Sequence, residues 1–389
     1  MPRAKSTPTK TTKWKIHLSE LCYGPEESEA VQKVLASRWL TMGAQTEKFE
    51  ATIAKHLGVK HAILVSSGTA ALHMALTSLG LGPEDEVIVP SITFVASANT
   101  VRHCGANPAF CDIESPEFPL VDLRDAASRI TPRTKVLMMV PYGGFPPRMD
   151  EVHEFCRRHR LQLLEDAAHA MGSSHHGKPL GTFGALGCFS FFSNKNMATG
   201  EGGLVVTNNA TLARRLRLLR SQGMTVNTWQ RHNSKSHGYD VVALGHNYRP
   251  SEITAALALV QLGKLAELNA ARAKCVELYT DEFSNEPKVA IPAGDPEGES
   301  SHHLMPILLP NSRLRDRVRQ SLIEGGIQVS HHYPPVHTFS AYRAQFRTAR
   351  LPNTELFARR ELTLPLHPLL KPKQIKTVTD TVKKALKSA

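Results

Sequence analysis

Short apolar runs separated by amphipathic stretches dominate the first half of the chain. Five of these runs have the length and composition of buried strands: residues 62–65, 87–89, 109–112, 136–140 and 161–165. Helical spacing of apolar residues separates the later runs, as over residues 150–160. Strands that alternate with helices predict an α/β fold with a largely parallel central sheet. In such sheets, ligands bind beyond the carboxyl ends of the strands.

A polar, glycine-rich loop lies between two further β-prone runs, residues 188–192 and 204–207. It carries one lysine, Lys195, which is flanked by asparagines and preceded by Ser190. A solvated loop lysine is the commonest explanation of such a position. The predicted strand that ends in an acid, at Asp166, favours instead a site in which the lysine and a carboxylate meet.

The strand predicted at residues 62–65 breaks into S-S-G-T before a helix. A strand, a turn of small residues and a helix N-terminus together present free backbone N–H groups to a phosphate. The hydroxyls of Ser67 and Thr69 would add donors, although an ordinary helix N-cap is the alternative. Phe94 and Tyr142 also follow predicted strand ends. One pocket could therefore gather a phosphate turn, an aromatic ring, a carboxylate and a lysine.

These are the parts that pyridoxal phosphate (PLP) requires. Its aldehyde forms a Schiff base with a lysine, and its ring nitrogen pairs with an acid. Its ring packs on an aromatic side chain, and its phosphate accepts hydrogen bonds from N–H and hydroxyl groups. The pattern therefore predicts a PLP-dependent enzyme.

The flanking segments predict further helices and a second, smaller domain. Residues 14–57 have a helical pattern, and Pro25-Glu26-Glu27 suits a helix start. The pattern is interrupted at R-W-L-T-M-G, in which Trp39 is either packing or the wall of a ligand site. A long helix at residues 262–282 precedes short mixed elements. We expect a basic disordered tail, a large PLP-binding domain and a small C-terminal domain, over residues 1–15, 16–262 and 263–389.

Composition changes this picture little. The chain is 41% hydrophobic and 21% charged, as in ordinary globular proteins, and no apolar run could span a bilayer. We therefore expect no membrane partner and a cytoplasmic location. The six cysteines lack C-x-x-C spacing, which argues against a zinc site or a disulfide framework, and we expect no metal. The net charge of +12 would attract acidic metabolites as readily as nucleic acid.

Several motifs carry a resemblance to a known family. They are S-S-G-T-A-A-L-H-M-A-L at 66–76, P-S-I-T-F-V-A-S-A-N at 90–99, E-D-A-A-H-A at 165–170, S-F-F-S-N-K-N at 190–196, G-E-G-G at 200–203, N-Y-R-P-S-E at 247–252, H-Y-P-P-V-H at 332–337 and L-P-L-H-P at 364–368. With these motifs the chain resembles the DegT/DnrJ/EryC1/StrS sugar aminotransferases, which are PLP-dependent enzymes of fold type I. The acid and the lysine at this spacing are the most specific part of the match.

The resemblance implies a role for each matching position. Lys195 would form the Schiff base and then move the proton between substrate and cofactor, while Asp166 would keep the pyridine nitrogen protonated. Asn247 would reach the phosphate from the neighbouring subunit of a homodimer with shared active sites. The other cofactor contacts would be Gly68, Thr69, Phe94, His169 and Ser190.

The substrate would lie among the surrounding loops. We expect the long polar loop at residues 224–241 to cover it. Arg231, His232 and Lys235 in this loop either face a diphosphate or are solvated. The substrate positions that we expect are Trp39, Thr41, Arg231, Arg249, His332 and Tyr333.

The expected reaction is transfer of an amino group from an amino acid to a keto-sugar. The resemblance implies L-glutamate as donor and a nucleotide-linked sugar as acceptor, in amino-sugar or glycosylated-metabolite biosynthesis. A free keto-sugar, a sugar phosphate or a keto-cyclitol is the alternative acceptor. A non-catalytic regulator that binds a polyanion through the basic tail is a hypothesis of another class, against which the intact Lys195 and Asp166 count. We expect no nucleic-acid partner.

Overall fold

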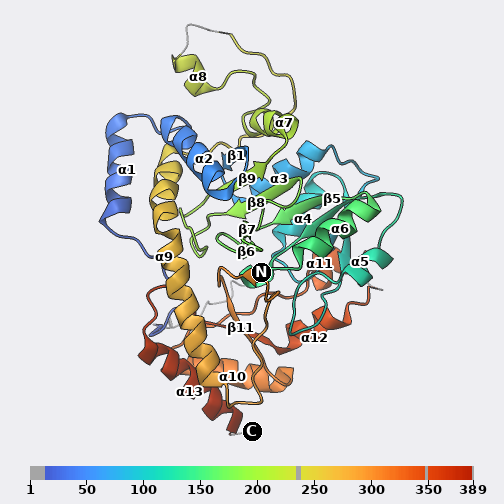
Figure 1. Cartoon of the computed structure of the whole chain (residues 1–389), viewed down its shortest axis with the longest axis vertical. Helices are drawn as coiled ribbons and strands as arrows, with labels where there is room; N and C mark the ends of the chain where they lie inside the picture. Colours follow the sequence, from blue (N-terminus) through green and yellow to red (C-terminus); the bar gives the residue numbers. More distant parts are fainter. Residues whose placement is uncertain (1–13, 234–237, 347–348, 388–389) are drawn as a thin grey trace, which may run out of the picture.

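A seven-stranded sheet forms the centre of the protein. The computed structural model describes residues 14–233, 238–346 and 349–387, and Figure 1 shows the chain along its shortest axis. The strand order is β1-β9-β8-β5-β4-β2-β3, and only β9 runs opposite to the other strands of this sheet. Their bounds are His61–Val65 (β1), Glu86–Pro90 (β2), Asn107–Cys111 (β3), Thr134–Met139 (β4), Gln162–Asp166 (β5), Leu186–Ser190 (β8) and Gly203–Thr207 (β9). The predicted α/β class is confirmed.

Helices cover both faces of the sheet, which explains why the strands are largely apolar. In β1, Leu64 packs into one core with α2 (Ala44–Leu57), α6 (Met149–His159) and α9 (Glu252–Phe283). Its neighbours Ile63 and Val65 pack into the opposite core with α3 (Gly68–Leu79), α4 (Ala96–His103) and α7 (Ala210–Arg220). Strands buried on both faces are continuous apolar runs rather than alternating ones. This is the pattern by which they were predicted.

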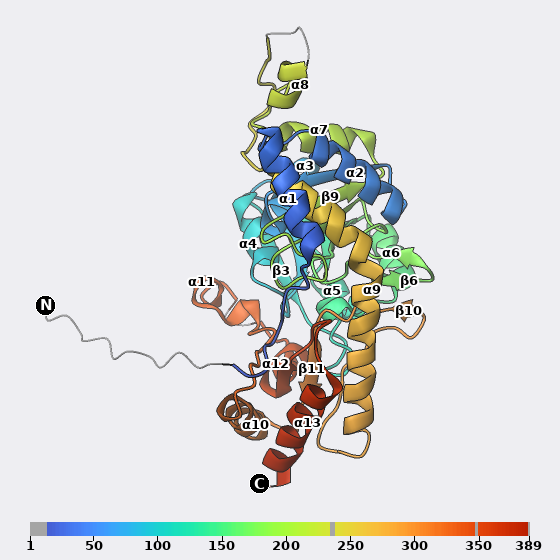
Figure 2. The same cartoon turned by 90° about the vertical axis from the view of Figure 1, so that its left-hand side faces the viewer.

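The C-terminal part has its own core and is joined to the sheet by the long helix α9 (Figure 2). The pair β11 (Met305–Leu308) and β12 (Glu361–Leu364) packs with α10 (Ser312–Glu324) and α13 (Pro372–Lys387). The N-terminal residue Ile16 also packs in this core. The remaining elements are α1 (Pro25–Ser37), α5 (Leu123–Ser128), β6 (Ser174–His175), β7 (Lys178–Pro179), α8 (Thr228–Asn233), β10 (Gly298–Glu299), α11 (Ser340–Arg343), α12 (Pro352–Arg360) and the short 3-10 turns Tyr142–Gly144 and Val336–Thr338.

One predicted boundary differs from the structure, because the long helix begins at Glu252 rather than at residue 262. The first helix begins at Pro25, the start that Pro25-Glu26-Glu27 predicts, although residues 14–24 of the predicted helical stretch are not helical. The predicted domain division at residues 262 and 263 therefore falls inside α9 and stays a prediction. In the part of the chain that the structure describes, no helix is long and apolar enough to cross a membrane.

Glu252, at the start of α9, holds the N-terminus of α2. Its buried carboxylate accepts hydrogen bonds from the backbone N–H groups of Gly43, Gln45 and Thr46, at 2.8, 2.7 and 2.9 Å. The first N–H groups of a helix have no partner within the helix, and the positive end of its dipole favours an anion. One side chain thus joins the N-terminal helices to α9.

We expect Glu252→Ala to lower the free energy of unfolding by about 3 kcal/mol, because it leaves several buried N–H groups without an acceptor. Denaturant titration followed by circular dichroism measures this change. Glu267→Ala, at an exposed position of the same helix, is the matched control and should change stability by about 0.5 kcal/mol or less. Equal effects of the two substitutions would contradict the assigned role.

Candidate active site

Lys195 lies in the loop that connects β8 to β9. Its backbone N–H donates to the Phe192 carbonyl at 2.9 Å, which closes a turn directly after the strand. Burial lowers the pKa of the Lys195 ammonium to about 8, and the negative charge of Asp166 opposes this shift. A lysine with a lowered pKa has a larger neutral fraction near neutral pH, and the neutral amine is the nucleophile. The surroundings of Lys195 therefore favour a reactive amine.

Asp166 ends β5, the strand next to β8. The Ser97 hydroxyl donates to its Oδ2 at 2.7 Å, and the Ala168 N–H donates to its Oδ1 at 3.4 Å. Burial raises the pKa of the Asp166 carboxyl, and the hydrogen bond from Ser97 opposes this shift. A buried carboxylate held in this way is prepared to meet a positively charged partner.

His169 is held in one tautomer. The Gly143 N–H donates to its Nδ1 at 3.2 Å, so in the neutral ring Nε2 carries the proton and faces the Tyr333 hydroxyl at 3.1 Å. Burial and the nearby Lys195 charge lower the pKa of His169 well below its usual value. Its ring is therefore neutral and offers an N–H donor. The Tyr333 ring lies 6.0 Å from that of Phe94, which is 56% exposed although it is large and apolar.

The turn between β1 and α3 touches the end of β8. A Cβ placed on Gly68 would lie 2.8 Å from the Ser190 Cβ, so only glycine allows this approach. The Ser67 hydroxyl caps α3 by accepting from the Ala70 N–H at 3.1 Å, while Thr69 is exposed at the same helix end. Gly68, Thr69 and Ser190 thus form one cradle of backbone N–H and hydroxyl groups.

The structure places the predicted substrate residues in two regions. His332 lies close enough to Lys195 that the lysine charge, together with burial as the larger cause, lowers its pKa to about 4. Trp39 and Arg231 instead belong to a separate cluster around the arm that contains α8, which projects from the body in Figure 1. There the Trp39 ring lies 5.1 Å from that of Trp229, and the Arg231 guanidinium lies over the Tyr239 ring.

The other predicted positions lie on segments near the β1 turn. The Ser66 N–H donates to the Tyr248 carbonyl at 2.9 Å, which places the neighbouring Asn247 and Arg249 beside this turn. The Asn247 side chain is exposed. Thr41 pairs with Ser251 in an isolated β-bridge. Lys235 and residues 1–13 of the basic tail lie outside the described residues.

Sequence reasoning missed the residues that support the predicted ones. Ser97 lies within the motif at residues 90–99, and the sequence prediction does not include it as the partner of Asp166. Its signal was the spacing of Thr93 and Ser97, whose hydroxyls are 2.7 Å apart at the start of α4. Asn196, beside Lys195, donates from its Nδ2 to the Asn269 side chain of α9 at 2.8 Å, and its Oδ1 accepts a hydrogen bond from His303 Nδ1 at 2.9 Å. No local pattern could have shown these long-range contacts.

The fold and the site together define a class of protein. A mostly parallel sheet covered on both faces, with a reactive lysine after β8 and a buried carboxylate at the end of β5, is that of an aminotransferase of PLP-dependent fold type I. The chain belongs to the DegT/DnrJ/EryC1/StrS aminotransferase family, whose model matches residues 22–383. The predicted family is thereby confirmed.

Individual relatives agree with this assignment. The chain is 39% identical to the dTDP-4-dehydro-2,3,6-trideoxy-D-glucose 4-aminotransferase of Saccharopolyspora spinosa, over 95% of this chain and 97% of the relative. PseC of Helicobacter pylori, an aminotransferase involved in pseudoaminic acid biosynthesis, superposes with a TM-score of 0.90 at 32% identity, over 96% of this chain and 100% of PseC. The PLP form of the putative sugar aminotransferase Spr1654 of Streptococcus pneumoniae gives 0.89 at 27% identity, over 95% and 98%.

The protein is therefore a sugar aminotransferase, with an amino donor and a keto-sugar acceptor, and its family is PLP-dependent.

Proposed function

We propose that this protein uses PLP to transfer the amino group of L-glutamate to a nucleotide-linked keto-sugar. The observation that carries this proposal is that Lys195, whose pKa is lowered, lies near the buried carboxylate of Asp166. The lack of a side chain at Gly68 lets the N-terminus of α3 approach Ser190, which brings the backbone N–H groups of the helix and the Ser190 hydroxyl together and suits a phosphate there. The donor set also fits, since the neutral His169 and the hydroxyls of Thr69 and Ser190 match a phosphorylated hydroxypyridine. These same residues count against a non-catalytic regulator.

Bound PLP supplies an electron sink for the negative charge that develops at the reacting substrate carbon. The residues of this chain do the rest. Lys195 holds the cofactor and carries the proton to and from that carbon. Asp166, oriented by Ser97, would pair with the ring nitrogen. The exposed Phe94 would pack on the ring and exclude water. The Nε2–H of His169, which faces the Tyr333 hydroxyl at 3.1 Å, would be the donor available to the ring hydroxyl when the cofactor is bound.

We further propose which residues contact the substrate and that two subunits share the active site. Arg249, His332 and Tyr333 would line the sugar subsite, while Trp39, Thr41 and Arg231 would contact the nucleotide end. Asn247 would reach the phosphate of the partner subunit's cofactor. Leu244, three residues before it, is 95% exposed, and Val241 and Val242 are exposed as well, as expected of a surface that a second copy covers.

The half reactions test this function. The PLP-loaded protein is exposed to L-glutamate, the amino acids are removed, and keto-sugars linked to dTDP, UDP or GDP are offered alongside a free keto-sugar. Return of the visible PLP absorbance with a nucleotide-linked sugar alone is the expected result. Equal return with the free keto-sugar, a sugar phosphate or a keto-cyclitol would favour the alternative acceptor. No bleaching by L-glutamate would exclude it as donor.

The pKa of Lys195 leads to a pH prediction. Only the neutral amine attacks the PLP aldehyde, so the rate of PLP uptake by the cofactor-free protein should rise about tenfold per pH unit at low pH. Because burial lowers the pKa of Lys195 to about 8, the rise should level off there rather than near the usual lysine value. Stopped-flow absorbance measures the rate. A rate that still rises steeply at higher pH would contradict the lowered pKa.

A further inference from the structure

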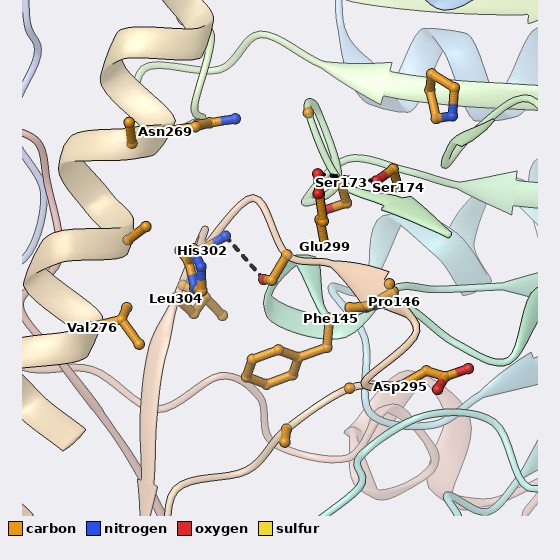
Figure 3. Close-up of a pocket in the computed structure, with 18 of the residues that line it drawn as sticks. Phe145, Pro146, Ser173, Ser174, Asn269, Val276, Asp295, Glu299, His302 and Leu304 are labelled. Carbon is orange, nitrogen blue, oxygen red and sulfur yellow. Dashed lines mark hydrogen bonds between the residues drawn. The ribbon is translucent and has the colours of Figure 1, made fainter. Parts of the chain in front are cut away.

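A second cluster of polar side chains lies away from Lys195, at the edge of a cavity of about 990 Å³ between α9 and the small sheet β10-β6-β7. Figure 3 shows this cavity, with Asp295 on the side opposite Asn269 and Val276. Two imidazoles and three carboxylates form the cluster. They come from the start of α6, the β6–β7 turn and the loop before β10, and they are Asp150, His175, His176, Asp295 and Glu297.

His175 is the buried member of the cluster. Only 2% of its side chain is exposed, yet neither ring nitrogen has a hydrogen-bond partner among the described residues. Its Nε2 lies 3.8 Å from the Oδ2 of Asp295, which is also buried. Buried polar groups nearly always have a partner, and an unsatisfied one costs free energy. The buried imidazole of His175 therefore has ring nitrogens that are available to bind a ligand.

The spacing of the other donor atoms fits a metal ion as this ligand. His176 Nε2 lies 3.4 Å from Glu297 Oε2 and 3.6 Å from Asp150 Oδ2. These distances are long for hydrogen bonds. They are close to the separation of about 3.3 Å between two ligands that each lie about 2.0 to 2.1 Å from a tetrahedral Zn²⁺. In each of two overlapping sets, one with Asp150 and His176 and one with Asp295 and Glu297, the donor atoms lie within 4.8 Å of one another and of His175.

The turn between β6 and β7 brings the two imidazoles together. His175 pairs with Lys178, and the two residues between them, His176 and Gly177, have φ angles of +48° and +74°. Positive φ at both positions is that of a type I′ turn, in which Asn-Gly is preferred. His176 takes the asparagine position, and its ring stacks on that of His175 with centroids 4.2 Å apart.

Nearby cations are engaged elsewhere. The Lys178 ammonium lies over the Phe183 ring, 4.2 Å from its centroid. The Arg148 guanidinium donates to both oxygens of Glu114, at 2.9 and 2.7 Å. The three carboxylates thus converge on the histidines, and a cation would offset their mutual repulsion.

We propose that this cluster binds a divalent transition-metal ion of the Zn²⁺ class. Imidazole and carboxylate together suit Zn²⁺, whereas Mg²⁺ and Ca²⁺ prefer oxygen ligands alone. The cysteine spacing that argued against a zinc site does not bear on a histidine and carboxylate site. Buried His175 and Asp295 lie on the inner side of the cluster, and His176, Glu297 and Asp150 lie towards solvent. The donors form two overlapping sets of three that share His175, so a four-coordinate ion would take its ligands from part of the cluster.

The ion would fasten the loop before β10 to β6 and α6. The chain leads from this loop to Ser301, whose hydroxyl donates to the His169 carbonyl at 2.8 Å, and to His303, which contacts Asn196 beside Lys195. The metal would thus be structural, and through Ser301 and His303 it would stabilise the loop that carries Lys195. It takes no part in the amino transfer itself.

Metal analysis of the untagged PLP-loaded protein tests the proposal. After equilibrium dialysis against Zn²⁺, the wild type should retain about one ion per chain, and Mg²⁺ should not compete. His176→Asn removes an imidazole but keeps a residue that the turn prefers, so it should fold and lose at least about 100-fold in Zn²⁺ affinity. His153→Gln, an exposed position of α6 outside the cluster, is the matched control and should bind as the wild type does.

Thermal unfolding gives a second readout that is independent of activity. With Zn²⁺ at about 100 times its dissociation constant, the midpoint of the wild type should rise by about 3 °C, and that of His176→Asn should not. Asp295→Asn, which keeps the shape of the loop, should lose the same rise. Absence of Zn²⁺ from the dialysed wild type, or equal binding by His176→Asn and His153→Gln, would overturn the proposal.

Discussion

Lys195→Ala should lower the turnover number at least about 10,000-fold, because the variant loses both the covalent hold on the cofactor and the proton carrier at the substrate carbon. The fold should persist. Burial disfavours the charged ammonium, as its lowered pKa shows, so removing the group relieves a desolvation cost rather than breaking a stabilising contact. Loss of activity with an unchanged unfolding midpoint is therefore the expected combination.

Borohydride reduction tests whether Lys195 itself binds the cofactor covalently or only lies near it. After reduction and denaturation, the wild-type protein should keep the cofactor attached to the peptide that contains Lys195, and Lys195→Ala should release it. Lys55→Ala, at an exposed position of α2, is the control and should label as the wild type does. Equal labelling of wild type and Lys195→Ala would show that another amine holds the cofactor.

The central sheet and the pairing of acid with lysine could be predicted because they depend on local pattern and one topological rule. Strands buried on both faces are apolar runs, and the ends of parallel strands meet at one edge, which brings Asp166 towards Lys195. The start of α9 was placed too late because its first turns are almost uniformly apolar and lack helical periodicity. The overlooked signal was Ser251, whose hydroxyl caps the helix by accepting from the Thr254 N–H at 3.0 Å.

The supporting contacts could not be predicted, since they join segments that are far apart in the chain. Asn196 meets Asn269 and His303 only after α9 and the C-terminal part have packed against the sheet. Trp39 and Trp229 come together from segments that are far apart in the chain, and no periodicity links them. Such contacts are set by tertiary packing, which overrides local preference.

The two adjacent acids at the end of β5, Glu165 and Asp166, make different contacts. Glu165 faces away from Lys195 and accepts from the backbone N–H groups of Gly181, Phe183 and Gly184 at 2.6, 2.6 and 2.7 Å, so it holds a loop in place. Asp166 receives fewer hydrogen bonds, and burial raises the pKa of both carboxyls, that of Glu165 to about 7. The negative charge of Asp166 is therefore costly to the fold, and in the proposed function that charge pairs with the ring nitrogen of the cofactor.

Asp166→Asn should for that reason lower the turnover number about 1,000-fold without lowering stability. The asparagine oxygen can still accept from Ser97, so the shape and the hydrogen bond remain while the charge that holds the ring nitrogen protonated is lost. Steady-state kinetics and thermal unfolding, measured on both variants, give the two numbers. Glu165→Gln is the matched neighbour and should show the reverse, a lower unfolding midpoint with a turnover number within about tenfold of the wild type. If Asp166→Asn kept a turnover number within about tenfold of the wild type, the ring nitrogen would need another partner. Asp166 would then be a structural acid like Glu165.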